Sequence, residues 1–467
     1  MQNFQLLING QSTPGASTMP VINPANEEII AQCPRADEAQ LNEAVLAAKT
    51  AFPAWASLDI SDRRAKLLAI ADDLEPRTEE FASLLTAEQG KPVKDATEEI
   101  FGTAVMIRML AANELPEKVL MDNELGRYIE HRSPLGVVAA ITPWNMPVTL
   151  MAIKVVSALL TGNTVVAKPA PTTPLTTLLF AELANRYLPP GVFNVITDLN
   201  DLGSALTTHP DIAKISFTGS TATGKKVMQS ASSSVKRVTL ELGGNDAAIV
   251  LDDVDPKEVA ASLFAGAMVN CGQICLAIKR AYVPSAIYDE VCDELVNLAD
   301  NMKVGDGSDP ATELGPIQNK MQFERVKELL ESARTEGNIV AGGDVSDTGF
   351  FVRPTIVRDV DDSARIVREE QFGPILPVLS YDDLDDAIAR ANDSSFGLGG
   401  TVWTANAERG AEVARRIHTG ICWVNSHMAF HPDVATGGAK QSGLGQEMGV
   451  EGIEEFTQRH VVFTPNA

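Results

Sequence analysis

Residues 213–224 read AKISFTGSTATG, and this stretch is the most informative about the fold of the chain. The short apolar run 213–217 predicts a buried strand, and a helical stretch over 222–232 follows a turn that holds Gly219, Ser220 and Gly224. A strand, a glycine-containing turn and a helix N-terminus in this order are typical of a phosphate-binding site. The form G-x-T-x-x-G is common in proteins, so its setting between strand and helix carries the inference.

Strand-like and helical runs alternate on both sides of this turn. The expected strands are 137–141, 164–167, 192–196, 213–217, 238–242 and 247–251, with helices over 148–160, 174–187 and 222–232. This alternation predicts an α/β fold in which helices cover both faces of a parallel sheet. Ligands of such sheets bind at the carboxyl ends of the strands.

The pattern restarts after Asp252, which predicts a second α/β domain. Its expected helices are 257–269, 287–302 and 319–336, and alternating segments continue to Val424. Two further stretches, 125–131 and 458–464, resemble strands that lie outside both sheets. Unpaired edge strands promote aggregation, so we expect these two to form a small sheet shared between subunits.

Length and composition indicate an ordinary globular enzyme of two or three domains. The chain has 467 residues and 45% hydrophobic residues. Its formal net charge of −24 disfavours binding to nucleic acid and to anionic membranes. No apolar run reaches the length of a membrane span, and the N-terminus lacks the basic region of a secretion signal.

The cysteines indicate reduced thiols and no metal site. The count of five is odd, and Cys271 and Cys275 lack the further ligands that a zinc site needs. We therefore expect a cytoplasmic protein without a metal.

Cys275 is the candidate nucleophile, and Glu241 is the candidate base. A thiolate adds to an aldehyde to give a thiohemiacetal, which expels hydride and leaves a thioester that water must cleave. The first step needs a cysteine activated below the usual thiol pKa of about 8.5, and the last needs a base. Glu241 ends an apolar strand just before Gly243 and Gly244, where a ligand can approach closely. The alternatives are a buried inert cysteine and a solvated acid beside a turn.

Asn145 and Lys168 also follow predicted strands. The Asn145 side chain, held between two prolines, could donate to an oxyanion together with the backbone N–H of Cys275. The Lys168 ammonium could reach ribose hydroxyls at the same sheet edge. The alternatives are a turn or cap asparagine and a surface lysine.

Over nearly its whole length the chain resembles the NAD(P)-dependent aldehyde dehydrogenase superfamily. The motifs that carry the resemblance are, in order, PWNMP at 143–147, KPA at 168–170, FTGST at 217–221, ELGG at 241–244, GQIC at 272–275, EQFGP at 370–374 and GGAKQSG at 437–443. The implied fold is a Rossmann-like parallel-sheet dinucleotide-binding domain (1–118 and 135–243), an α/β catalytic domain (244–448) and a small β oligomerisation arm (119–134 and 449–467).

The resemblance assigns a role to each candidate residue. Cys275 is the nucleophile, Glu241 the base for deacylation and Asn145 the oxyanion donor, while Lys154 and Glu447 form a buried proton relay near the base. The residues implied to line the dinucleotide are Trp144, Lys168, Gly219, Ser220, Gly224, Leu242, Glu370 and Phe372. The assembly implied is a homodimer or homotetramer.

Three departures from the family pattern bear on specificity. Pro171 stands where NAD-preferring members often have Glu, so NADP stays open, but no further Arg or Lys near Lys168 would neutralise a 2′-phosphate, which favours NAD. Ala435 and Thr436 replace the usual proline and aromatic residue, so one wall of the substrate tunnel lacks a ring. Gln446 replaces an arginine at a position peripheral to the chemistry.

The candidate substrate residues are apolar. Met146, Leu150 and Ile153 are one helical turn apart and are implied to face the substrate tunnel, although they could equally pack in the core. Ile274 and Leu276 flank the nucleophile. No arginine is evident to hold a distal carboxylate, so we expect a medium aliphatic or aromatic aldehyde. His427 and His431 lie in the expected loop over the tunnel.

Three other functions compete with hydrolytic aldehyde oxidation. A CoA-acylating enzyme would need no water-activating base, which Glu241 argues against. A cofactor-free thiol hydrolase would leave the Gly219 turn unexplained. A non-catalytic binding protein predicts the loss of a catalytic residue, whereas Cys275, Glu241 and Asn145 are all present.

Overall fold

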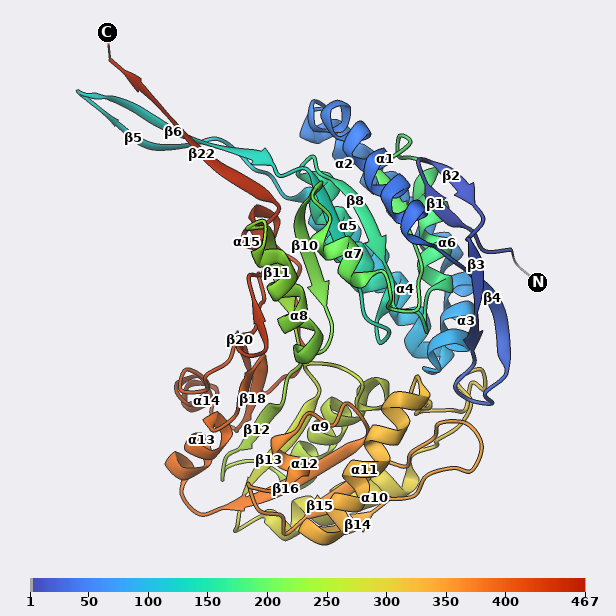
Figure 1. The fold of residues 1–467 in the computed structure, drawn as a ribbon. Helices are drawn as coiled ribbons and strands as arrows, with labels where there is room; N and C mark the ends of the chain where they lie inside the picture. Colours follow the sequence, from blue (N-terminus) through green and yellow to red (C-terminus); the bar gives the residue numbers. More distant parts are fainter. Residues whose placement is uncertain (1–2, 467) are drawn as a thin grey trace.

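An eight-stranded sheet forms the upper part of the molecule in Figure 1, where the computed structural model describes residues 3–466. The strand order is β2-β1-β9-β8-β7-β10-β11-β21. Their bounds are β1 (Leu6–Ile8), β2 (Gln11–Thr13), β7 (Val137–Ile141), β8 (Thr164–Lys168), β9 (Phe193–Val195), β10 (Ile212–Thr218), β11 (Arg237–Glu241) and β21 (Gly443–Leu444). Strands β7 to β11 run parallel, as predicted, and antiparallel strands close both edges.

Helices cover both faces of this sheet because its central strands are apolar on both sides. In β7, Val137, Ala139 and Ile141 face one core, and Val138 and Ala140 face another. The first core includes residues of α1 (Glu38–Ala56), α7 (Gly203–Thr208) and α8 (Thr221–Ser232). The second includes residues of α2 (Ile60–Leu74), α3 (Thr78–Gln89), α4 (Val93–Ala112), α5 (Pro147–Leu160) and α6 (Leu175–Asn185).

A second sheet of seven strands lies below the first in Figure 1, in the order β14-β15-β16-β13-β12-β18-β19. Its strands are β12 (Asp246–Val250), β13 (Ile278–Pro284), β14 (Asn338–Ala341), β15 (Thr355–Arg358), β16 (Ile375–Tyr381), β18 (Gly399–Trp403) and β19 (Ile421–Val424). Its helices are α9 (Pro256–Met268), α10 (Tyr288–Asn301), α11 (Lys320–Glu336), α12 (Arg365–Arg368), α13 (Leu384–Asn392) and α14 (Ala407–Ala414). This sheet has a hydrophobic core of its own.

One sheet assignment from the sequence is wrong. The strand expected over 247–251 does not complete the first sheet, because β12 pairs in parallel with β13 and β18 of the second. The turn through Gly243 and Gly244 carries the chain from one sheet to the other. Conversely, the short β21 returns to the first sheet and pairs with the end of β11.

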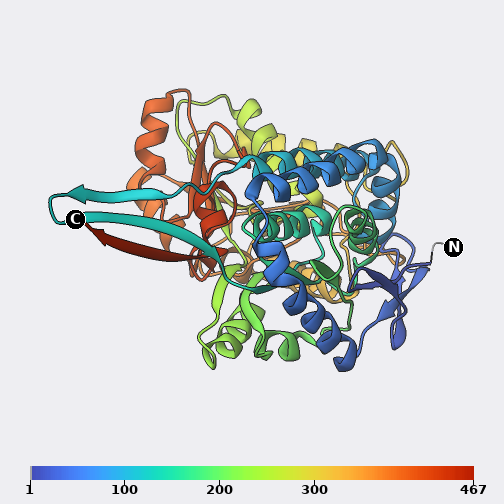
Figure 2. The ribbon, with the colours of Figure 1, turned by 90° about the horizontal axis from the view of Figure 1, so that it is seen from above.

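A three-stranded arm projects from the body, as Figures 1 and 2 both show. It consists of β22 (Thr457–Pro465), β6 (Gly126–Pro134) and β5 (Lys118–Asn123), all antiparallel. The two strands expected here are confirmed, and β5 is an additional one. The arm carries exposed large apolar side chains at Val119, Leu120, Met121, Leu125, Tyr128, Val461, Val462 and Phe463.

The remaining elements are short. They are a hairpin of β3 (Ser17–Ile22) and β4 (Ile29–Arg35), a pair of β17 (Phe396–Gly397) and β20 (Ala439–Lys440), α15 (Gly449–Glu454), and the 3₁₀ turns η1 (Glu75–Arg77) and η2 (Val269–Gly272). Between residues 3 and 466, no helix combines the length and apolar character needed to cross a membrane.

Helix ends differ from the expected bounds by one or two residues where a cap fixes the start. Ser220 accepts from the Thr223 backbone N–H, so α8 begins at Thr221 rather than at Ala222. Asn319 caps α11 in the same way, and Pro147 occupies the first turn of α5.

Candidate active site

The carboxyl ends of four neighbouring strands meet at one edge of the first sheet. Ile141 of β7 pairs with Lys168 of β8 and with Phe217 of β10, and Thr218 of β10 pairs with Glu241 of β11. The segments that follow these strands hold Asn145, Lys168, the Gly219 turn and Glu241. The predicted residues of the first sheet are thus brought to one edge.

The second sheet approaches this edge with the N-terminal ends of its strands. The Cys275 loop leads into β13, and the Glu370 segment leads into β16. The carbonyl of Cys275 lies so close to Gly244 that a Cβ on that glycine would collide with it. Cys275 therefore lies beside the turn that follows Glu241.

The loop before Cys275 has a strained backbone. Asn270, Cys271 and Gly272 all have positive φ, of 49°, 58° and 69°. Left-handed conformation is unfavourable for residues other than glycine, so contacts must hold it in place. Gln273 supplies two: its Nε2 donates to the Asn270 carbonyl at 2.9 Å, and its Oε1 accepts from the Gln318 backbone N–H at 2.8 Å.

Cys275 is partly exposed, whereas Cys271 is buried. The surrounding protein raises the pKa of the Cys275 thiol to about 12, chiefly by removing water, while the charge of Lys279 acts in the opposite direction. The thiol therefore needs local stabilisation to react as a thiolate.

Asn145 is fixed against the nucleophile loop. Its Nδ2 donates to the Gln273 carbonyl at 2.8 Å, two residues before Cys275. Its own carbonyl accepts from Asn270 Nδ2 at 3.2 Å and from Lys91 Nζ at 3.0 Å. An amide nitrogen has two N–H groups, so one remains for a ligand.

Glu241 is a carboxyl whose Oε1 is buried and has no hydrogen-bond partner within residues 3–466. Burial and the neighbouring Glu447 raise its pKa well above the usual value, and Lys154 opposes them. Lys154 and Glu447 form a buried ion pair, and the Ser216 hydroxyl donates to Glu447 Oε1 at 3.4 Å. The structure therefore groups the three residues predicted as base and relay.

The predicted dinucleotide residues line the same edge. A Cβ at Gly224 would lie 2.4 Å from the tip of the Leu242 side chain, so α8 packs closely against the turn after β11 at this glycine. The rings of Trp144 and Phe372 meet edge to face, with centroids 5.3 Å apart. Glu370 Oε1 accepts from the Gly244 backbone N–H at 2.9 Å.

Lys168 is buried in a polar network rather than free. Its Nζ donates to Asp198 Oδ1 at 2.7 Å and to Asn200 Oδ1 at 3.1 Å. The charge of its ammonium is thus already paired with a carboxylate.

The predicted substrate residues separate into two groups. Met146, Ile274 and Leu276 are partly exposed beside the nucleophile loop. Leu150 packs against the second core of the first sheet, and Ile153 belongs to that core with 7% of its surface exposed.

Aromatic side chains gather near Leu276. His427 Nε2 donates to the Leu276 carbonyl at 2.8 Å, and burial lowers the pKa of His427 to about 4. Its ring lies 5.3 Å from the Trp423 ring, which in turn meets Phe430 at 5.5 Å. His431 is exposed and pairs with Asp433.

Two polar residues at the site carried no sequence signal. Asp246 is buried beside Cys275, accepts from the Gly399 backbone N–H at 3.1 Å, and has a pKa raised by burial to about 7. Lys279 is buried and donates to carbonyls of the nucleophile loop. Neither residue stands in a recognisable motif. Lys279 lies close to Cys275 in the sequence, and this proximity is the one signal that could have drawn attention to it.

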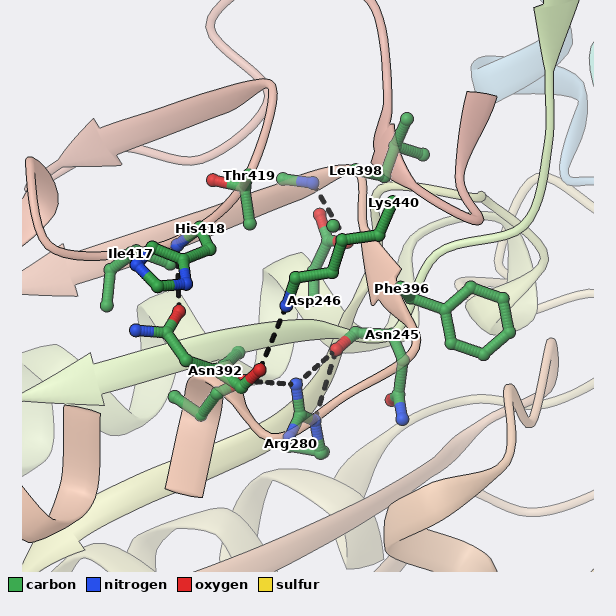
Figure 3. Close-up of a pocket in the computed structure, with 14 residues that line it drawn as sticks. Asn245, Asp246, Arg280, Asn392, Phe396, Leu398, Ile417, His418, Thr419 and Lys440 are labelled. Carbon is green, nitrogen blue, oxygen red and sulfur yellow. Dashed lines mark hydrogen bonds between the residues drawn. The ribbon is translucent and has the colours of Figure 1, made fainter. Parts of the chain in front are cut away.

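Asp246 also lines a small pocket, which Figure 3 shows. Arg280 spans its floor and donates to the carbonyls of Asn245 and Ala391. Lys440 donates to the Asn392 carbonyl at 2.9 Å. None of the predicted catalytic residues lines this pocket.

Comparison with known proteins places the chain in one family. The sequence profile of the aldehyde dehydrogenase family matches residues 11–462. A mitochondrial aldehyde dehydrogenase of Leishmania tarentolae is 39% identical, with 97% of this chain and 93% of that protein covered. A geranial dehydrogenase of Castellaniella defragrans is 37% identical over 95% of this chain and 94% of its own length.

The structural comparison agrees. A Bacillus cereus aldehyde dehydrogenase, solved in complex with NAD+, superposes with a TM-score of 0.97 at 37% identity, covering 99% of this chain and 97% of its own. The α/β fold and the thiol site therefore define an oxidoreductase that acts on aldehydes. The chain belongs to the aldehyde dehydrogenase family.

Proposed function

We propose that the protein oxidises a medium aliphatic or aromatic aldehyde to its carboxylic acid with NAD, through a thioester on Cys275. The single observation that carries the hydrolytic outcome is Glu241, a half-buried residue near the thiol whose carboxyl Oε1 is buried and has no hydrogen-bond partner among residues 3–466. An acyl transfer to coenzyme A would have no use for such a base.

Cys275 and Asn145 perform the first step. The Cys275 thiolate attacks the aldehyde carbon, and the developing oxyanion accepts from the backbone N–H of Cys275 and from the Asn145 N–H that Gln273 does not engage. When the oxyanion collapses, the carbon loses hydride and the sulfur retains the acyl group. The nicotinamide supplies the hydride acceptor in this step.

Glu241 and the Lys154–Glu447 pair perform the second step. The Glu241 carboxylate takes a proton from water as the water attacks the thioester, and the carboxylic acid leaves with the Cys275 thiolate restored. The positive charge of Lys154 favours the ionised form of Glu241, and Glu447 opposes it. The pair thus sets the pH at which the base becomes active and offers the proton a route away.

The residues at the sheet edge fit a dinucleotide. Gly224 lets the N-terminus of α8 approach the sheet, and the first-turn backbone N–H groups of α8, apart from that of Thr223, which Ser220 caps, would bind a phosphate. Trp144 and Phe372 offer ring surfaces, and Glu370 would accept from ribose hydroxyls. These side chains, with Lys168, Gly219 and Leu242, would hold the cofactor.

Lys168 supports NAD over NADP. A 2′-phosphate needs an unpaired cation, and the Lys168 ammonium is already neutralised by Asp198. The Bacillus cereus relative, solved with NAD+, is consistent with this preference.

The walls beside Cys275 support an apolar substrate. Met146, Ile274 and Leu276 line the approach, and Trp423 with Phe430 supplies the aromatic surface that Ala435 and Thr436 do not. Leu150 and Ile153 lie in or against the second core of the first sheet and would support this wall from behind. The name of the geranial dehydrogenase relative points to a medium-length apolar aldehyde as well.

A spectrophotometric panel tests this function. Aliphatic, aromatic, quaternary-ammonium and carboxylated aldehydes are supplied with NAD or NADP, with and without coenzyme A, and absorbance at the reduced nicotinamide band is followed. We expect the highest kcat/KM with NAD and an apolar aldehyde, and free acid as product. Formation of an acyl-CoA, or ester hydrolysis without dinucleotide reduction, would contradict the proposal.

Assembly, compartment and domain boundaries complete the proposal. The exposed apolar arm supports a homodimer or homotetramer. A cytoplasmic location rests on the composition alone. The division at 243/244 follows the change from the first sheet to the second after β11.

A further inference from the structure

Lys279 holds the nucleophile loop by its ammonium. Its Nζ donates to the carbonyls of Ile274 at 2.9 Å, Cys275 at 2.7 Å and Ala277 at 3.2 Å. An ammonium has three N–H groups, so carbonyls of this loop occupy all of them. Lys279 as a whole residue is only 2% exposed.

The burial of this charge requires an explanation, because removing an ammonium from water is unfavourable. Three carbonyl contacts satisfy its hydrogen bonds, but a neutral donor would satisfy some of them without that cost. The one carboxylate within ion-pair distance, across residues 3–466, is Glu370, at 3.9 Å. The charge itself therefore points to a function.

The charges around Cys275 show what that function is. Lys279 favours the ionised thiol, whereas Glu370, Asp246 and Glu241 oppose it. Lys279 and Asp246 stand at the starts of β13 and β12, Glu370 lies in the segment before β16, and Glu241 ends β11. Burial keeps His427, near Lys279, in its neutral form. Lys279 is thus the cation that offsets three nearby carboxyls.

We propose that Lys279 is a positioning residue for the proposed nucleophile: its ammonium fixes the loop carbonyls so that the thiol faces the site, and its charge stabilises the Cys275 thiolate. Asp246 acts in the opposite direction, as a buried carboxyl whose ionisation disfavours the thiolate. The inference rests on the assignment of Cys275 as the nucleophile but not on the identity of the substrate or cofactor.

The test measures ionisation of the Cys275 thiol directly. The full-length protein is alkylated with iodoacetamide from pH 6 to pH 11, the rate is followed by mass spectrometry of the Cys275 peptide, and Cys275→Ser provides the blank. The variants are Lys279→Met, which keeps the chain length without the charge, Lys279→Arg, which keeps the charge, and Asp246→Asn. Lys236→Met is the matched control. Lys236 also donates to two backbone carbonyls, but it lies just before β11, at the opposite end of that strand from Glu241.

We expect Lys279→Met to slow alkylation by about tenfold or more across the measured range, which lies below the thiol pKa and therefore reports a rise of at least about one unit in that pKa. Lys279→Arg and Lys236→Met should react at rates near the wild-type value, and Asp246→Asn should react faster above about pH 7, where Asp246 is ionised. Lys279→Met rates equal to the wild-type rates would overturn the proposal, because a merely structural lysine changes stability and not thiol ionisation.

Two safeguards keep the result decisive. If circular dichroism shows that Lys279→Met does not fold, Asp246→Asn decides the matter, and an unchanged alkylation rate above about pH 7 in that variant overturns the charge argument. If Lys279→Met slows alkylation of Cys275 as expected but the wild-type protein oxidises no aldehyde, the result supports the role of Lys279 and refutes the proposed function. The two failures are therefore distinguishable.

Discussion

At the residue scale, burial raises the pKa of both groups that the proposed chemistry uses. The Cys275 thiol and the Glu241 carboxyl each lose water on folding, and each is surrounded by further carboxyls. Both must be deprotonated to act. The positive charges of Lys279 and Lys154, which lie beside them, favour that ionisation. Their effect is stronger here than in solvent, because charge interactions are less screened in the protein interior.

Replacing Cys275 by alanine should abolish oxidation while leaving the dinucleotide site intact. The thioester requires the sulfur, so we expect turnover to fall by at least about 10³-fold. Calorimetric titration with NAD should give an affinity near the wild-type value. Residual turnover close to wild type would show that another group is the nucleophile.

Replacing Glu241 by glutamine should separate the two steps. Acylation does not need the base, so a burst of reduced nicotinamide close to one per active site is expected, followed by a steady state slower by about 10²–10⁴-fold. Stopped-flow absorbance measures both phases. Loss of the burst together with the steady state would place Glu241 in the first step instead.

The pH profile should show a raised acid limb. Because the Glu241 pKa lies above its ordinary value, the carboxylate is lost as pH falls through that raised pKa, so hydrolysis of the thioester slows at a higher pH than an exposed glutamate would give. Single-turnover decay of the acyl enzyme, followed across pH, checks this. In Glu241→Gln the decay should lose this limb.

At the scale of elements, buried side chains fix the starts of helices. Glu88 at the end of α3 accepts from the backbone N–H groups of Leu175 and Thr176, at 2.7 Å and 2.9 Å, where α6 begins. Burial nevertheless raises its pKa to about 7. A carboxyl with a raised native pKa binds its proton more tightly when folded, so its contribution to stability is greatest below the unfolded pKa and declines as pH rises through about 7.

Replacing Glu88 by alanine should destabilise the fold. The backbone donors at the start of α6 would be buried without partners, at a cost of about 1–3 kcal/mol. Thermal unfolding at a fixed scan rate measures the change. Glu79→Ala, an exposed acid on the same helix, is the control and should leave the midpoint nearly unchanged.

At the scale of the whole molecule, the arm has too little to pack against. Its strands pair with one another, yet large apolar residues on both β5 and β22 remain exposed in the single chain. Exposed apolar patches of this kind mark contact surfaces. Figure 2 shows the arm extending away from both sheets, so the body of the single chain does not cover it.

Charged residues on the arm should therefore weaken assembly. We expect Val119→Glu combined with Leu120→Glu to reduce the molecular mass measured by light scattering toward that of one chain. Met321→Glu is the control, since Met321 is 78% exposed on α11, away from the arm. An oligomer that persists unchanged in the double variant would exclude β5 from the interface.

Local elements and the order of the motifs could be predicted from the amino-acid sequence. Alternating apolar runs and helical periodicity predicted β7, β8, β10 and β11 closely, because burial patterns are properties of neighbouring residues. The Gly219 turn predicted the start of α8 for the same reason. The three residues Cys275, Glu241 and Asn145 were predicted as site residues because each stands in a short motif.

Only the tertiary structure decided which sheet β12 joins and which charges surround the thiol. An apolar run looks the same in either sheet, and the turn at Gly243 and Gly244, with the pairing of β12 to β13, settles its place. Lys279 and Asp246 are ordinary residues in the sequence. They matter because folding removes water around them and brings them beside Cys275, and electrostatic effects depend on distance and burial rather than on position along the chain.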